Sequence, residues 1–212
     1  MNVGSRPSSE ARAALREAKD LGLRTLVVSG RRYPELVPYV RGLRYVDGIV
    51  AENGAIVEAP MGSAPRVFGR RIGGAVRARL AARPPFEVEY GDVVVSVRAR
   101  DGPRLRRAVV GLPVDLIGNV RHLMALPRGI GKGSGARRAV RELGLGRHAY
   151  AAIGDAENDL DLLRGARLSG AVANAEPAVR RAVDYVCHAR YESGVLEFVR
   201  GPLTEHVRGA PD

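Results

Sequence analysis

The residues best suited to chemistry form the segment Gly154-Asp155-Ala156-Glu157-Asn158-Asp159, which lies between an apolar run at 150–153 and a helix-like run at 160–163. A strand that ends on one aspartate and presents a second at the next helix start places two carboxylates at one sheet edge. These carboxylates, Asp155 and Asp159, suit a hard cation such as Mg2+, which binds one or two carboxylates together with water and phosphate oxygens. The alternative is a plain helix N-terminus, where Asp and Asn are favoured caps.

Two earlier segments end strand-like runs on small polar residues. The first run leads into Ser29-Gly30 and the second into Glu52-Asn53-Gly54-Ala55. The Ser29 hydroxyl and the backbone N–H of Gly30 can donate to a phosphate group, although a Ser-Gly turn also explains this pair. An Asn-Gly turn that joins two strands explains the second segment equally well.

Lysine use singles out one residue. The chain has 34 Lys and Arg residues, and only Lys19 and Lys132 are lysine. Lys132 lies in Gly131-Lys132-Gly133, at the start of a predicted helix. A compact ammonium can approach one phosphate oxygen as a point charge, whereas a guanidinium is wide and planar. A surface lysine retained by chance is the alternative, as Lys19 illustrates.

These four segments, in this order, resemble the haloacid dehalogenase superfamily, and within it the branch of the archaeal phosphoglycolate phosphatases and sucrose-phosphate phosphatase-like enzymes. The resemblance extends from about residue 8 to residue 200 and implies a Mg2+-dependent phosphomonoester hydrolase of carbohydrate metabolism that acts on small phosphorylated metabolites such as phosphoglycolate. It implies a catalytic Lys132, a phosphate site of Ser29, Gly30, Lys132 and Asn158, and a metal site of Asp155 and Asp159.

One motif of the family is missing. Its first strand ends in Asp-x-Asp-Gly-Thr, whose first Asp attacks phosphorus, and this chain leads from Met1 into a helix with no such segment. One hypothesis is that the natural protein starts upstream, because losing a central strand leaves buried backbone groups unpaired, each at a cost of about 1–3 kcal/mol. The other is a catalytically inactive, phosphate-binding pseudophosphatase.

Composition limits the other classes of function. No apolar run approaches the roughly 18 residues that span a membrane, and a single cysteine, Cys187, fits a reducing cytoplasm. The net charge of +11 suggests nucleic acid. Against that class, only 5% of the residues are aromatic, none is Trp, and the arginines are scattered. The sequence does not indicate an oligomeric state.

Strand and helix alternation predicts an α/β fold with a Rossmann-like parallel sheet core and an inserted small α+β cap domain. We expect core segments at 1–59 and 127–212 and the cap at 60–126, where alternating strands are separated by helices. Ser8 or Ser9 and Gly22 should bound the first helix. The tail from Gly201 is expected to be loosely held.

Overall fold

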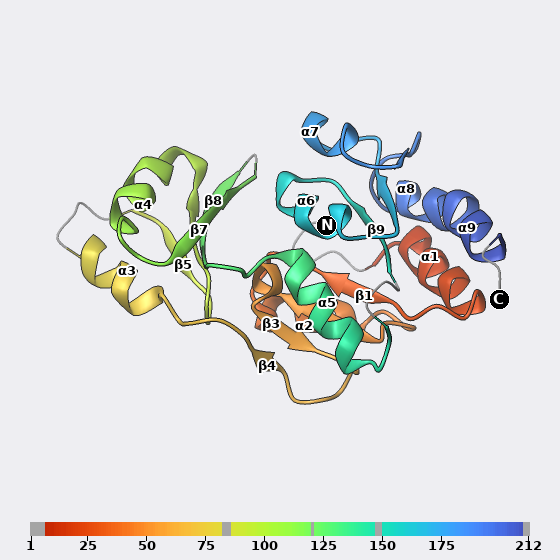
Figure 1. Cartoon of the computed structure of the whole chain (residues 1–212), viewed down its shortest axis with the longest axis horizontal. Coiled ribbons are helices and arrows are strands. Elements are labelled where there is room, and N and C mark those ends of the chain that lie inside the picture. The colour runs from red at the N-terminus through yellow and green to blue at the C-terminus, as the bar shows by residue number, and fades with distance from the viewer. Residues whose placement is uncertain (1–6, 82–85, 120, 147–149, 210–212) are drawn as a thin grey trace.

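The computed structural model describes residues 7–81, 86–119, 121–146 and 150–209. The core helices are α1 (Ser9–Asp20), α2 (Tyr33–Arg41), α5 (Lys132–Glu142), α6 (Leu160–Arg164), α7 (Pro177–Arg180), α8 (Tyr191–Phe198) and α9 (Thr204–Arg208). The core strands are β1 (Leu26–Val28), β2 (Gly48–Ala51), β3 (Ile56–Glu58), β4 (Arg66–Val67), β9 (Ala151–Gly154), β10 (Leu168–Ala171) and β11 (Tyr185–Val186). The cap contains α3 (Gly73–Leu80), β5 (Val88–Tyr90), β6 (Val95–Arg98), α4 (Gly102–Ala108), β7 (Val114–Gly118) and β8 (His122–Pro127). Figure 1 shows the cap, in yellow and green, beside the core.

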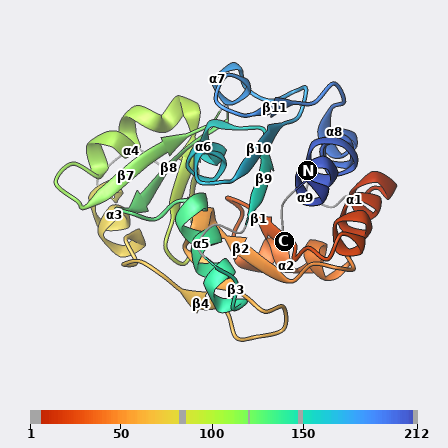
Figure 2. The same cartoon turned by 45° about the vertical axis from the view of Figure 1, so that its right-hand side comes forward.

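Helix α1 has the boundaries that its sequence predicts. The Ser8 side chain accepts a hydrogen bond from the Ala11 backbone N–H at 3.1 Å, and Gly22 ends the helix region with a φ of +77°. Ala14 and Ala18, one helical turn apart, are buried. They pack α1 against α8, and the two helices lie side by side in Figure 2.

The core sheet consists of two groups of strands. In the first, β1 and β2 are parallel while β3 and β4 are antiparallel additions, in the order β1-β2-β3-β4. In the second, β11, β10 and β9 are all parallel. Strands β1 and β9 are therefore each at the edge of their group. Strand β2 is completely buried, whereas every residue of β1 is only partly buried.

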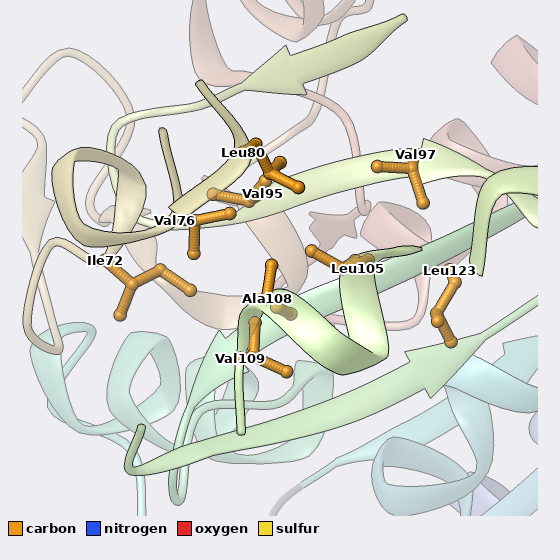
Figure 3. Close-up of a cluster of buried hydrophobic side chains, with 10 residues drawn as sticks. Ile72, Val76, Leu80, Val95, Val97, Leu105, Ala108, Val109 and Leu123 are labelled. Atoms are coloured by element: carbon orange, nitrogen blue, oxygen red, sulfur yellow. The ribbon is translucent and has the colours of Figure 1, made fainter. Parts of the chain in front are cut away.

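The cap is an antiparallel sheet of order β5-β6-β8-β7 with α3 and α4 packed on one face. Alternate residues of β6, Val95 and Val97, point into a buried apolar cluster that Figure 3 shows. Leu105 of α4 is completely buried in the same cluster. This layer has its own hydrophobic core, as expected for an inserted α+β unit. The short strand β4 lies within the predicted cap range of 60–126 but pairs with β3 of the core.

The prediction for the C-terminal tail is wrong. A π-helical stretch, Val199–Leu203, continues α8 directly into α9, which ends at Arg208. Val199 and Leu203 are buried against Ala14 and Ala18 of α1, so apolar burial holds this segment. Cys187 is buried, and this burial raises the pKa of its thiol to about 11.

The predicted fold class is confirmed: a parallel α/β core carries an inserted α+β cap. No helix in the described parts of the chain is long and apolar enough to cross a membrane.

Candidate active site

Lys132 and Asp159 form a buried ion pair. Lys132 is the first residue of α5, and its Nζ lies 2.5 Å from Oδ1 of Asp159. The exposed fractions of the two side chains are 9% and 7%. The sequence predicts a phosphate role for one residue and a metal role for the other, and the structure shows that they are direct partners.

The second oxygen of Asp159 is also occupied. Oδ2 accepts hydrogen bonds from the backbone N–H groups of Asp155 at 3.2 Å and Ala156 at 3.1 Å. These bonds close the loop between β9 and α6, whereas the Asp159 side chain makes no N-cap hydrogen bond to α6 itself. Both oxygens of Asp159 therefore have protein partners, and its carboxylate positions the loop and the lysine.

Asp155 differs from Asp159 in its surroundings. Its side chain is exposed at the carboxyl end of β9. In the described parts of the chain no cluster of three or more His, Cys, Asp or Glu side chains could enclose a metal ion. One exposed carboxylate nevertheless fits Mg2+, because this ion keeps several waters and takes further ligands from substrate phosphate.

Asn158 leaves a hydrogen-bond acceptor unsatisfied. It is buried, its Nδ2 donates to Oδ1 of Asn53 at 3.0 Å, and its Oδ1 has no partner in the described structure. A buried orphan acceptor costs about 1–3 kcal/mol. A cation or a hydroxyl donor can satisfy it, whereas a phosphate oxygen without a proton cannot. The available atom of Asn158 thus suits the metal side of the site better than the phosphate side.

The Ser29-Gly30 segment follows β1 and contacts Asn53, the hydrogen-bond partner of Asn158. The Ser29 carbonyl accepts from the Asn53 N–H at 3.0 Å, and its Oγ accepts from the Arg31 N–H at 3.2 Å. A Cβ on Gly30 would lie 3.0 Å from Asn53 Oδ1, so a side chain at this position would press on the amide. Asn53, on the 3₁₀ turn Glu52–Gly54, thus touches both strand ends and joins Ser29 and Gly30 to Asn158.

Asp161 has a role that sequence reasoning missed. We expect its side chain to point away from the site into solvent, and it is indeed exposed. Its Oδ2, however, accepts a hydrogen bond from the Gly133 backbone N–H at 2.8 Å, so a carboxylate from α6 caps α5. Spacing along the chain gives no signal for a cap whose partner is 28 residues away.

The three histidines that the structure describes lie outside the site. His122 and His206 are partly buried elsewhere in the fold, and His188 pairs with Glu197 at 3.1 Å on the surface. The spacing of the four histidines in the sequence does not indicate a metal site, and the fourth, His148, lies outside the described residues.

A cleft of about 200 Å³ separates the two groups of core strands. Leu26 and Val28 of β1 line it on one side, and Ala151 and Ile153 of β9 line it on the other. Helices α5 and α6 contribute further apolar side chains, and Asp159 also lines the cleft. Asn53 contacts the residues after β1 and after β9, so both strands run in the same direction toward one edge. The cleft therefore has a parallel strand edge on each side.

Comparison with known proteins identifies this arrangement. A family model described as haloacid dehalogenase-like hydrolase matches residues 1–64 and 119–199. The chain belongs to this family. The resemblance inferred from the four sequence segments is thereby confirmed, and the site lies in a haloacid dehalogenase superfamily phosphatase.

Similar proteins agree with the family assignment. The phosphoglycolate phosphatase of Methanothermobacter thermautotrophicus is 31% identical over 201 residues, which cover 92% of this chain and 90% of that protein. That of Metallosphaera sedula is 29% identical over 206 residues, which cover 88% and 85%. Protein 0175 of Thermoplasma acidophilum has the same fold, with a TM-score of 0.75 at 18% identity over 95% of this chain and 90% of that one.

Proposed function

We propose that this haloacid dehalogenase-like hydrolase binds the phosphate group of a small phosphorylated metabolite, with phosphoglycolate as the first candidate, and that Mg2+ assists it. The observation that carries the proposal is the buried Lys132–Asp159 pair, whose Asp159 carboxylate accepts a hydrogen bond from the backbone N–H of Asp155, a residue with an exposed side chain. The names of the two archaeal relatives support the choice of phosphoglycolate.

Each site residue has a distinct role in this proposal. Lys132 offers a fixed positive charge that neutralises the transferring phosphoryl group, and Asp159 keeps its ammonium in place. Ser29 and Gly30 offer polar groups at the end of β1. Asp155 and Asn158 are the residues that would hold Mg2+, and the ion would supply charge neutralisation at the phosphate.

The described residues do not provide an obvious attacking carboxylate. Asp159 is paired with Lys132, and Asp155 is committed to the metal in this proposal. A strand inserted between β1 and β9 would end at the same edge as Ser29 and Asp155, where open α/β sheets bind ligands. We therefore propose that hydrolysis requires a carboxylate carried into the cleft on an extended segment. Without such a segment, the chain binds phosphate but does not hydrolyse it.

Calorimetric titration of phosphoglycolate in the presence of Mg2+ tests phosphate binding. The parent protein should bind, Lys132→Met should lose at least about tenfold in affinity, and Lys19→Met should bind like the parent, because Lys19 lies at the exposed end of α1. Lys132→Arg keeps a cation beside Asp159 and should also bind weakly, since a planar fork does not reproduce the point contact. Equal affinity in Lys132→Met and Lys19→Met would remove Lys132 from the site.

A further inference from the structure

Glu52 is a buried carboxylate that joins the core to the cap. It lies on the 3₁₀ turn that also carries Asn53, and only 1% of its surface is exposed. Its two oxygens accept hydrogen bonds from three consecutive backbone N–H groups of the cap, those of Asp92 at 2.9 Å, Val93 at 2.9 Å and Val94 at 3.2 Å. These three residues form the turn between β5 and β6.

Three hydrogen bonds to the Glu52 carboxylate connect the cap hairpin firmly to the core. A buried charge is strongly unfavourable unless other groups compensate it, and consecutive N–H groups in a turn form a concave site for an anion. The turn is also shaped for this side chain, because a Cβ on Gly91 would lie 2.5 Å from Glu52 Oε2. A larger residue at position 91 would therefore separate the hairpin from the carboxylate.

The core end of the connection is equally fixed. Glu52 and Asn53 have left-handed φ angles of 47° and 52°, which are uncommon for residues with a side chain. The Glu52 N–H donates to the Arg31 carbonyl, and the Asn53 N–H donates to the Ser29 carbonyl. The turn that holds the cap hairpin is therefore bonded to the Ser29-Gly30 segment of the site.

Apolar contacts surround this connection. Val93 and Val94 belong to a buried cluster with Ala55 next to the turn and with Ile130 ahead of α5. On the cap side, Met124 Sδ accepts a hydrogen bond from Asn53 Nδ2 at 3.2 Å. Exclusion of water strengthens the bonds to Glu52, because hydrogen bonds are electrostatically stronger at low local dielectric.

We propose that Glu52 fixes the β5–β6 hairpin of the cap to the core turn that also carries Asn53 and contacts Ser29. The connection does not require the proposed reaction. It should be measurable in a protein with no activity, so its failure and the failure of the proposed function are separate results.

Hydrogen exchange of the Asp92, Val93 and Val94 amides tests this role. Glu58→Gln is the matched control, because Glu58 is also 1% exposed but accepts its hydrogen bonds within the core, from the Tyr33 hydroxyl at 2.5 Å and the Gly62 N–H at 2.7 Å. Glu52→Gln should accelerate exchange of the three amides by at least about tenfold beyond any change in global unfolding, because the charge is lost and an NH2 group faces N–H donors. Glu58→Gln should change the exchange rates of these three amides by less than about twofold, again beyond any change in global unfolding.

A second variant approaches the connection from the cap. Gly91→Ala should accelerate the same three amides, whereas Gly74→Ala, at an open position of α3, should not. If Glu52→Gln does not fold, the exchange rates of the three amides in Gly91→Ala decide whether the connection holds the hairpin. Unchanged exchange in Gly91→Ala, or equal acceleration in Glu52→Gln and Glu58→Gln, would overturn the proposal.

Discussion

Lys132 and Asp159 are the most deeply buried ion pair among the described residues, and each depends on the other. Lys132→Met would leave the Asp159 charge buried with only two N–H donors. We expect this change to lower the free energy of unfolding by about 3 kcal/mol, measured by urea denaturation. Lys132→Met combined with Asp159→Asn should recover part of the loss, because the orphan charge is gone. A single variant as stable as the parent would show that the pair contributes nothing to the fold.

Asp155 is the residue on which a response to Mg2+ should depend. Because the ion would bind the folded form only, it should raise the free energy of unfolding by about 2.7 kcal/mol at 100 times its dissociation constant. The melting temperature measured across a Mg2+ titration should rise for the parent and for Asp20→Asn, an exposed carboxylate at the end of α1. It should stay flat for Asp155→Asn. A full response in Asp155→Asn would remove this carboxylate from the metal site.

Among the elements, those with local signals were predictable. Ser8 and Gly22 mark α1 through capping chemistry, and the strand-like run that leads into Glu52 is β2. The sequence predicts a helix across 36–40, and the observed α2 is longer because it begins at Tyr33 with a proline in its first turn. The tail was misjudged because Leu203 has a partner in α1, almost two hundred residues earlier in the chain, and burial against a distant element leaves no periodic signal of its own.

The start of α5 approaches the Glu52–Gly54 turn too closely for side chains. A Cβ on Gly135 would lie 2.5 Å from both Gly54 Cα and Val50 Cγ1. Gly135→Ala should therefore destabilise the protein by about 2 kcal/mol, despite the better helix propensity of alanine. The matched control Gly74→Ala has no atom within 4 Å of its new Cβ and should not destabilise it. Equal melting temperatures for the two variants would contradict the close approach.

At the scale of the whole molecule, the motifs predicted which residues gather but not how they are paired. Ser29 and Asn158 follow core strands and Lys132 begins α5, all at one sheet edge, and that much follows from parallel strand order. The Lys132–Asp159 pair, the cap contact of Glu52 and the cleft between β1 and β9 each join segments that are distant in the chain. Tertiary packing decides these contacts, and no local pattern encodes them.

The most direct test of the account is the rate of phosphate release from phosphoglycolate with Mg2+, measured for the chain alone and with a synthetic strand. The strand is a peptide of four or five β-branched apolar residues followed by Asp-x-Asp-Gly-Thr, and its control carries Asn at both Asp positions. We predict no more than trace release by the chain alone and measurable release only with the Asp peptide, which supplies the attacking carboxylate through the cleft. Robust release by the chain alone that Asp155→Asn abolishes would contradict the account, as would a bound Asp peptide that gives no release.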